Sequence, residues 1–201
     1  MVFIIDDDAG VRSAMQRLLK SVGLDAEVFA APRDFLRRKR PDVSSCLILD
    51  VRLPEISGLE VQRKLIDAGV KIPIIFITAH ADIPMSVKAM KSGAVEFLTK
   101  PFRDQDLLDA IQQALEQDRR AREEQSELLE LRRRYESLTP RERQVLRLVA
   151  SGRSSKEIAS TLGTSEVTAK VHRSQMMHKM QAGSLVELGR MAEKLKVPAK
   201  E

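Results

Sequence analysis

Four short apolar segments of the chain each end in residues that can bind a cation or a phosphate. The segments cover residues 2–5, 46–49, 74–77 and 97–99, and the residues that follow them are Asp6 with Asp7, Asp50, Thr78 and Lys100. Short, continuously apolar segments of this kind are typical of strands buried on both faces of a parallel sheet. The carboxyl ends of such strands lie along one edge, where open α/β folds bind ligands. Three carboxylates, a hydroxyl and an ammonium group should therefore converge there, which indicates a site for a divalent cation and a transferable phosphoryl group.

The acidic residues suit a hard metal ion. Mg²⁺ (or Mn²⁺) prefers oxygen ligands and keeps several waters. We assign the metal ligands to Asp7 and Asp50, with Asp6 binding directly or through water, and with the backbone carbonyl of Arg52 as a further oxygen. Charge neutralisation and alignment dominate phosphoryl transfer, so the Asp50 carboxylate can attack phosphorus and serve as the phosphoacceptor.

Two further strand-end residues complete the predicted site. Lys100 would pair with phosphoryl oxygens as a compact point charge, and Thr78 would hydrogen-bond a newly arrived oxygen and move its loop. Pro101 suggests a cis peptide bond that directs Lys100. Each residue alone is more often a helix cap, a turn residue or a solvated side chain. Four such coincidences on four strands favour the functional interpretation.

Three nearby residues receive structural roles. We expect Asp8 to cap the first helix and His80 to be a loop residue rather than a metal ligand. Cys46 lies at the opposite end of its strand from Asp50, and it is interpreted as a buried structural thiol.

The segments between the strands have the apolar spacing of helices, and residues 26–29 supply one more strand. Alternating strands and helices over residues 1–116 predict an α/β fold with a parallel sheet and right-handed crossovers. Five strands fit the flavodoxin-like order, in which strand 26–29 lies at an edge. That strand lacks a reactive residue at its end, in agreement with a position far from a central site.

Composition and charge narrow the class of protein. The 201 residues are 43% hydrophobic, and no apolar stretch reaches the roughly 18 residues needed to span a membrane. Acids as early as Asp6 argue against a signal peptide, and a single cysteine is typical of a reducing compartment. We therefore expect a cytoplasmic protein.

The charge is unevenly distributed along the chain. Residues 137–201 carry 12 Lys and Arg against 6 Asp and Glu, whereas residues 1–120 are balanced at 18 each. This asymmetry indicates a polyanion partner, with a solvated basic surface as the alternative.

Residues 117–136 are highly polar and contain neither Gly nor Pro, so we expect a helical linker. Leu128, Leu131 and Tyr135 leave open the alternative of a helix–helix contact at its end.

The final segment, residues 137–201, is predicted to be an all-α domain of four helices. Their start signals are Thr139 with Pro140, Ser155, Ser165, and Gly183 with Ser184.

The second and third of these helices have the order of a helix-turn-helix unit, with the turn at 162–165. The second helix of such a unit enters the major groove with its N-terminal part toward the bases. Its expected outer residues are Glu166, Thr168, Ala169, Lys170, His172, Arg173 and Lys179. We expect Val167, Val171 and Met176 or Met177 to pack inward. A charged, solvated helix is the alternative, but clustered basic residues favour DNA binding.

The residues of the acidic site resemble the receiver domain of two-component response regulators over residues 1 to about 120. The matching motifs are Asp6-Asp7, Leu49-Asp50-Val51-Arg52-Leu53-Pro54, Thr78-Ala79 and Lys100-Pro101-Phe102. The resemblance implies that Asp50 accepts phosphate from a sensor histidine kinase and that Mg²⁺ is required. It also implies that Phe97 reorients when Thr78 moves. Phosphorylation would then favour dimers through the fourth helix, fifth strand and fifth helix.

The last third resembles the LuxR-type DNA-binding domain over about residues 137–201. The motifs are Leu138-Thr139-Pro140-Arg141-Glu142, Lys156-Glu157-Ile158-Ala159 and Val167-Thr168-Ala169-Lys170-Val171-His172. The resemblance implies base contacts from Lys170 and Val171. It places Thr168, His172 and Lys179 near phosphates. Family members often have a basic or polar residue at the position of Ser174, whose hydroxyl reaches less far, and Arg173 is expected to substitute for it in part as a DNA contact.

These observations predict a transcriptional response regulator that is phosphorylated at Asp50 and binds promoter DNA. The expected partners are a sensor histidine kinase, double-stranded DNA, a second copy of the chain and RNA polymerase, with no membrane partner. A phosphatase with an aspartyl nucleophile is the enzyme alternative, but its second acid would stand where this chain has Arg52. We expect no enzymatic activity beyond self-phosphorylation from donors and slow autodephosphorylation. A regulator that works without phosphate is the third alternative.

Overall fold

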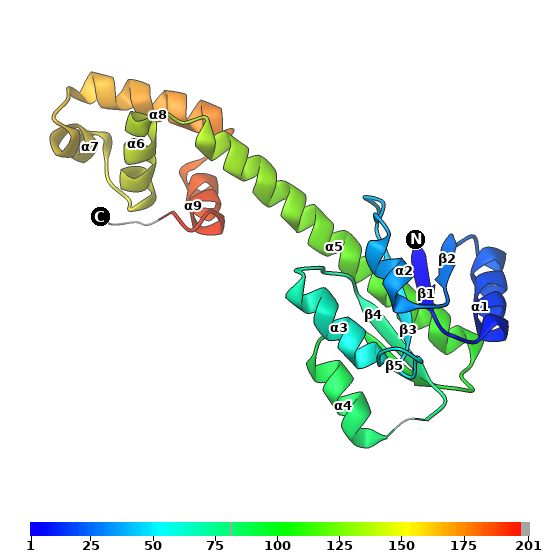
Figure 1. Ribbon diagram of the computed structural model, residues 1–201. Coiled ribbons are helices and arrows are strands. Elements are labelled where there is room, and N and C mark those ends of the chain that lie inside the picture. Colours follow the sequence, from blue (N-terminus) through cyan, green and yellow to red (C-terminus); the bar gives the residue numbers. More distant parts are fainter. Residues whose placement is uncertain (81, 198–201) are drawn as a thin grey trace. The chain divides into compact units, whose positions relative to one another are not determined.

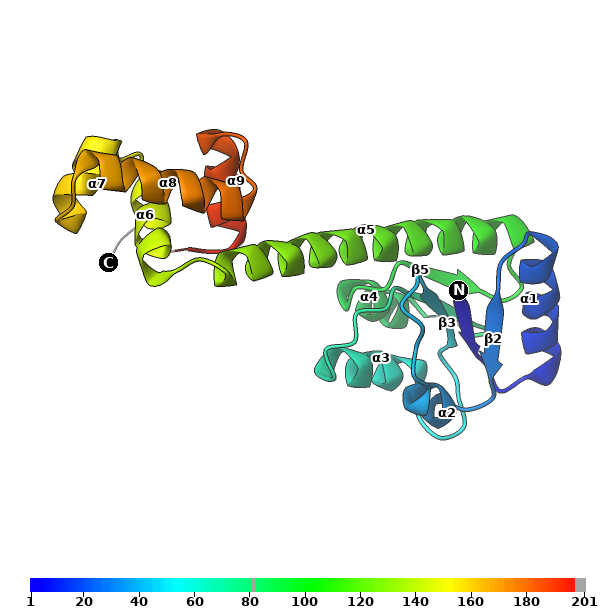
Figure 2. The same ribbon diagram turned by 90° about the horizontal axis from the view of Figure 1, so that it is seen from above.

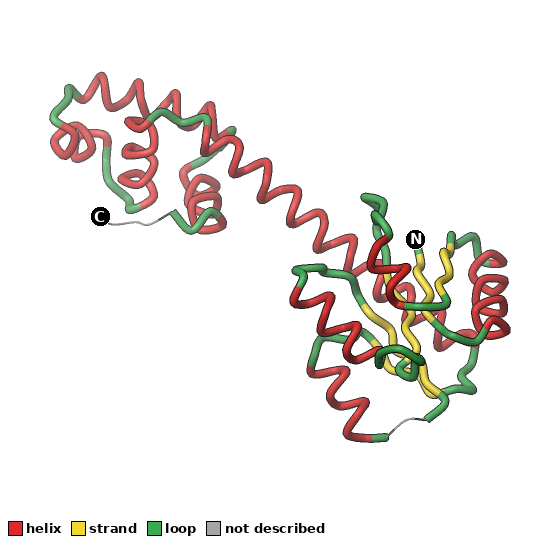
Figure 3. The backbone as a smooth tube through the Cα atoms, viewed as in Figure 1, coloured by secondary structure: helices red, strands yellow, loops and turns green. Residues whose placement is uncertain are grey.

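The computed structural model describes residues 1–80 and 82–197. Contacts within the chain divide it into two compact units, Met1–Arg122 and Glu123–Glu201, which are considered one at a time. Within the described residues, strands occur only in the first unit, and the second contains helices and loops (Figure 3). No helix in residues 1–80 and 82–197 is long and apolar enough to traverse a lipid bilayer.

The first unit is built from a five-stranded parallel sheet with helices on both faces (Figures 1 and 2). Its elements are β1 (Val2–Ile5), α1 (Ala9–Ser21), β2 (Ala26–Phe29), α2 (Pro32–Arg37), β3 (Cys46–Asp50), α3 (Gly58–Asp67), β4 (Ile74–Thr78), α4 (Ile83–Lys91), β5 (Glu96–Thr99) and the start of α5 (Asp104–Glu136). The strand order is β2-β1-β3-β4-β5. The flavodoxin-like prediction is therefore confirmed, and β2 lies at an edge.

Alternating residues of the three central strands fill two separate cores. One core joins the sheet to α1 and α5, with the helical residues Met15, Leu19, Leu107, Ile111 and Ala114. The other joins it to α2, α3 and α4, with Phe35, Val61, Leu65 and Ala89. Because β1, β3 and β4 are buried on both faces, each strand ends in a fixed register at the carboxyl edge.

The helix α5 continues without a break through the predicted linker. Leu131 is buried and Tyr135 packs beside it in the apolar core of the second unit. The helix–helix contact that the sequence left open is therefore present at the end of α5.

The second unit contains four helices after α5 in its described residues. They are α6 (Pro140–Ala150), α7 (Ser155–Leu162), α8 (Glu166–Met180) and α9 (Leu185–Lys194). Thr139, Ser165 and Ser184 cap helices as predicted. The cap predicted at Ser155 is one residue late, because Ser154 and Glu157 form the reciprocal capping box that starts α7. Gly163 ends α7 in the left-handed conformation, with φ of 62°.

The prediction that Val167 and Val171 pack inward is wrong, because both valine side chains are exposed. The buried residues of α8 are Ala169, Met176 and Met180. These three recur at spacings of seven and four and so share one face of a helix. Packing of α8 against α6 and α7 selects this face over the one through Val167 and Val171 that the spacing predicted. The expectation that Ala169 is an outer residue is therefore wrong as well, whereas Met176 packs inward as expected.

Candidate functional site

The register of the sheet brings the predicted acidic residues together. Ile5 of β1 pairs with Leu49 of β3, so Asp6 and Asp50 follow at the same level of the sheet. Both carboxylates are buried, with Asp50 only 6% exposed. The Asp50 carboxylate is held in place by the Arg52 N–H, which donates to Oδ1 at 2.8 Å. The Asp6 carboxylate is held likewise, because Oδ1 accepts from the Asp8 N–H at 2.9 Å.

Lys100 bridges the two buried carboxylates. Its Nζ atom lies 2.6 Å from Oδ2 of Asp50 and 2.7 Å from Oδ2 of Asp6. The peptide bond between Lys100 and Pro101 is cis, as suggested by the sequence. The backbone N–H of Lys100 donates to the Thr78 carbonyl at 2.8 Å. The ammonium group is thus held by the residues at the ends of β1 and β3, and the Lys100 backbone is held by the end of β4.

Burial and charge act in opposite directions at this site. Burial raises the pKa of Asp6 above its ordinary value, although the hydrogen bond from Lys100 partly offsets that effect. Burial lowers the pKa of Lys100, but the hydrogen bonds to Asp50 and Asp6 outweigh it and leave the Lys100 pKa raised. The lysine is therefore held in its charged form beside the carboxylates.

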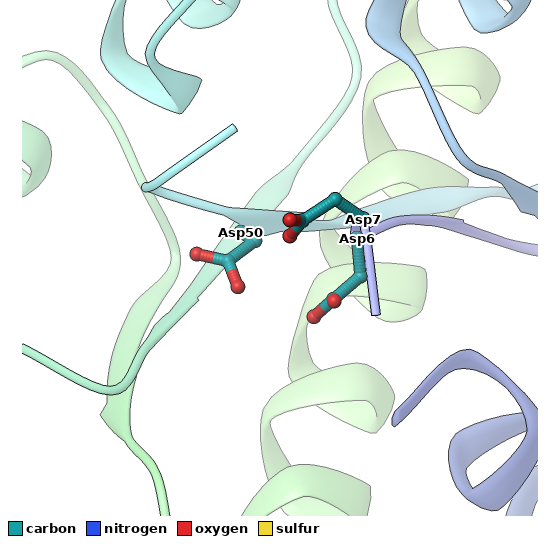
Figure 4. Close-up of side chains that lie close together, drawn as sticks. All are labelled: Asp6, Asp7 and Asp50. Carbon is teal, nitrogen blue, oxygen red and sulfur yellow. The ribbon is translucent and has the colours of Figure 1, made fainter. Parts of the chain in front are cut away.

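Asp7 supplies the third carboxylate and is exposed to solvent. One oxygen from each of Asp6, Asp7 and Asp50 lies within 4.8 Å of the others (Figure 4). Three hard oxygen donors this close fit a divalent cation such as Mg²⁺, which takes one or two carboxylates and fills its remaining positions with water and phosphate oxygens. The open side at Asp7 gives such an ion access. The role of the Arg52 carbonyl stays a prediction.

The hydroxyl of Thr78 lies at the end of β4 and is fully buried. It accepts from the His80 N–H and donates to the His80 carbonyl, both at 3.3 Å. The hydroxyl therefore holds the β4–α4 loop instead of contacting Asp50. Phe97 in β5 is half-buried and packs on Phe76, with ring centroids 6.2 Å apart.

The second candidate site is the outer surface of α8. Lys170 is exposed and forms an ion pair with Glu166 at 2.8 Å. Thr168 Oγ1 lies 2.8 Å from the Ser165 hydroxyl at the start of the helix. Val171 is exposed as well. These residues lie in the first half of α8, as expected for the part of a recognition helix that meets bases.

Of three other predicted DNA contacts, two form hydrogen bonds within the domain and the third is half-buried. Lys179 donates to the buried carboxylate of Glu142 at 2.7 Å, so it already has a structural partner. Arg173 donates to the Ser155 hydroxyl at 3.4 Å. His172 is half-buried, and its Nδ1 atom is buried without a hydrogen-bond partner.

Comparison with known proteins matches both units. A model of the response regulator receiver domain matches residues 2–112, which is more than half of the chain. A model of the luxR family of bacterial regulatory proteins matches residues 136–192. The chain belongs to the LuxR-type response regulators.

Relatives of this response regulator match over nearly its whole length. Nodulation protein W of Bradyrhizobium diazoefficiens is 50% identical and covers 99% of this chain and 88% of its own. Transcriptional regulatory protein FixJ of Rhizobium meliloti is 41% identical, with 95% and 94% covered. The solved structure of the response regulator StyR has a TM-score of 0.87 at 47% identity and covers 96% of this chain and 98% of its own. The receiver domain implies a kinase partner, and the LuxR-type domain implies DNA binding.

Two residues that support the receiver site were missed by sequence reasoning. Nη1 of Arg12 donates to the carbonyl oxygens of Asp6 at 2.7 Å and Asp7 at 2.8 Å, which holds the acidic turn. Gly58 lies against β3, where an added Cβ would stand 2.4 Å from the Asp50 carbonyl oxygen. The glycine was visible in the sequence only as a turn signal, and nothing in the sequence pointed to Arg12.

The structural roles predicted for Asp8 and Cys46 in this response regulator agree with the structure. Asp8 Oδ1 accepts from the Gly10 and Val11 N–H groups and caps α1. Cys46 is fully buried, and burial raises the pKa of its thiol to about 12. His80 lies in the loop after β4, beside Thr78.

Proposed function

We propose that phosphorylation of Asp50 switches this response regulator between two states of its receiver domain. The observation that carries the proposal is the position of Lys100, whose ammonium group joins Asp50 to Asp6 while Asp7 stands open beside them. A buried, oriented carboxylate with a cation beside it is arranged for attack on phosphorus. The phosphoryl donor is the phosphohistidine of a sensor kinase.

The transfer exchanges one bond for another. An oxygen of Asp50 forms a bond to phosphorus, the phosphorus–nitrogen bond of the donor breaks, and the departing imidazole nitrogen keeps the electron pair and takes a proton from water. The product is an acyl phosphate on Asp50. Asp7, Asp50 and Asp6, with the Arg52 carbonyl as a further ligand, would hold Mg²⁺, and the bound ion would supply positive charge that lowers repulsion between the anionic reactants.

The residues around Asp50 then respond to the new phosphoryl group. Lys100 follows the negative charge from the Asp50 carboxylate to a phosphoryl oxygen. Thr78 exchanges its two hydrogen bonds with His80 for one with the phosphoryl group, which moves the β4–α4 loop. Phe97 turns on Phe76 as the space beside Thr78 changes.

The loop movement favours a dimer through α4, β5 and α5. The helix α4 supports this part of the proposal, because Ile83, Val87 and Met90 are exposed apolar residues along it. A dimer places two LuxR-type domains on promoter DNA, with Lys170 and Val171 toward bases. Thr168, His172 and Lys179 lie near phosphates, and Arg173 is a further DNA contact. RNA polymerase is the partner whose activity at the promoter changes when the dimer binds. Everything in this cycle takes place in the cytoplasm.

Intact mass measurement with acetyl phosphate and MgCl₂ tests the receiver half. The wild-type chain should gain one phosphoryl group, and Asp50→Asn should gain none. Asp8→Asn is a matched control, because Asn also caps helices and Asp8 does not contact the phosphoryl position. A phosphoryl adduct on Asp50→Asn would contradict the assignment. Continuous release of phosphate with rapid turnover would favour the phosphatase alternative.

A binding assay with promoter fragments tests the other half. Lys170→Ala should lose selective binding while its phosphorylation by acetyl phosphate stays unchanged. Unaltered selectivity would contradict the role of Lys170. DNA affinity that is equal with and without acetyl phosphate would favour the alternative of a regulator that works without phosphate.

A further inference from the structure

Two valine side chains are exposed to solvent on α8, the helix that we propose binds DNA. Val167 is 72% exposed and Val171 is 49% exposed. They are one helical turn apart in the first half of α8. Exposed valines are unfavourable there for two reasons: they keep apolar surface in water, and β-branched residues are poorer helix formers than Ala. Among the described residues of the second unit, the apolar core includes neither valine.

The valines lie on the face of α8 opposite its core face. With 100° per residue in an α-helix, Val167 and Val171 are about 160° and about 200° around the axis from Ala169. Ala169, Met176 and Met180 are buried and define the direction of the domain core. The two valines therefore point away from α6 and α7 together.

The surroundings of the valines suit a polyanion better than a protein. The side chain of Lys170 lies between them in sequence and is 64% exposed. Residues 137–201 carry 12 basic against 6 acidic side chains. Two isolated valines are far too small for a stable protein interface, which buries roughly 800 Å² on each partner. Two exposed valines beside a lysine on the second helix of a helix-turn-helix unit are suited to the major groove, which presents apolar methyl groups and negatively polarised acceptor atoms.

We propose that Val167, together with Val171, reads the C5-methyl groups of thymines in the operator. This inference rests on the proposed DNA-binding function of α8 and adds a specificity residue to it. In the major groove a thymine presents its methyl group, and apolar side chains recognise thymine through that contact. Burial of the methyl against a valine removes apolar surface of both from water.

The spacing of the valines restricts the sequence that they read. Four residues of α-helix advance about 6 Å, and successive base pairs are about 3.4 Å apart. Where the helix axis follows the groove, the two methyl groups should lie roughly two base-pair steps apart. Val167 reads one position and Val171 reads the other.

The test uses duplexes selected from a random library by the full-length chain. Each thymine of the selected sequence is replaced in turn by deoxyuridine, which lacks only the methyl group. Wild-type affinity should fall about fourfold at two positions, the ratio expected for one methyl-sized group. We call this loss of affinity the uracil effect. With Val167→Ala, replacement of thymine by deoxyuridine should no longer lower the affinity at one of these positions and should still lower it at the other. Val171→Ala should do the converse.

Val186→Ala is the matched control, since Val186 is an exposed valine on α9 of the same domain. It should keep the uracil effect at both positions. Val167→Ala also introduces a better helix former, so loss of folding does not explain its result. Failure of the selection to yield any preferred sequence would overturn DNA reading by α8 altogether. A preferred sequence whose thymines tolerate uracil, or a uracil effect unchanged by Val167→Ala, would overturn the valine assignment alone.

Discussion

The Nζ atom of Lys100 lies 2.6 Å from Oδ2 of Asp50, although the two residues are 50 positions apart in the chain. The same atom also contacts Asp6. A cationic side chain between two buried carboxylates offsets their mutual repulsion and lets them lie close together. It also competes with any metal ion that approaches the same oxygens. Several measurable properties of the receiver domain depend on this contact.

Lys100→Met should raise the affinity of the receiver for Mg²⁺. Without the ammonium group, the three carboxylates repel one another, and a divalent cation relieves that repulsion. The thermal midpoint of the variant should lie below that of wild type in EDTA and should rise further on addition of MgCl₂. A MgCl₂ titration of the melting temperature measures both effects. Lys71→Met, at an exposed position, should leave the Mg²⁺ response unchanged. An identical response in Lys100→Met would contradict the competition.

Gly58→Ala should destabilise the receiver by about 1–3 kcal/mol, the usual cost of overpacking. The new Cβ would stand 2.4 Å from the Asp50 carbonyl oxygen and 3.0 Å from Val51 Cα, and backbone atoms cannot rotate away. Displacement of β3 should also slow phosphorylation by acetyl phosphate. Denaturant unfolding followed by circular dichroism measures the first effect, and intact mass against time measures the second. Gly189→Ala in α9, where nothing lies within 4 Å, should be neutral or stabilising. Equal stability of Gly58→Ala and wild type would refute the close approach.

Acid should unfold the C-terminal domain through Glu142. Burial raises the pKa of Glu142, but hydrogen bonds from Lys179 and Thr139 outweigh burial, so the pKa is lowered below 4.5. The unfolded state then binds the proton more readily than the folded state. The stabilisation is complete above about pH 4.5 and is lost as the pH falls through the folded value. Glu142→Gln should cost about 2 kcal/mol at pH 7 and flatten this dependence.

Tyr135 is a selective probe for that measurement. It is the only tyrosine in a chain without tryptophan, and it packs on the core of the second unit, with the Arg143 guanidinium carbon 5.3 Å from its ring centroid. Tyrosine fluorescence against denaturant at several pH values therefore reports on the C-terminal domain. Glu193→Gln, an exposed acid on α9, serves as the control. A pH profile of Glu142→Gln that matches wild type would reject the assignment.

The Cys46 thiol should resist labelling while the receiver is folded. Burial raises its pKa to about 12, so it stays protonated at pH 8, and no reagent reaches it at 0% exposure. Labelling by a disulfide reagent should follow the unfolding rate and increase with denaturant. Since Cys46 is the only cysteine, the signal has a single source. Rapid labelling in native buffer would contradict the burial of Cys46 in β3.

The acidic site was predictable because the sheet topology was predictable. Continuously apolar strands must be buried on both faces, buried parallel strands share one carboxyl edge, and the residues after them must therefore meet. That reasoning located Asp6, Asp7 and Asp50. It also located Lys100, although the strand before it, β5, lies at an edge of the sheet and is only partly buried, contrary to expectation. Helix starts at Thr139 and Ser165 followed from local capping chemistry, which depends on neighbours in the chain alone.

By itself, then, the sequence determined the strands, the residues that end them and the helical C-terminal domain, because these depend on periodicity and local hydrogen bonding. The strand order was predicted from the flavodoxin-like arrangement that five alternating strands fit. Only the tertiary structure decided which stripe of α8 is buried, since Val167 and Ala169 have equally acceptable helical spacing and packing against other helices chooses between them. It alone showed that Arg12 holds the carbonyls of the acidic turn and that Lys179 is bound to Glu142. The Lys179–Glu142 contact joins residues 37 positions apart, and Arg12 reaches back to the carbonyls of the turn before α1. Both contacts depend on how the groups lie in space, which apolar spacing along the chain does not encode.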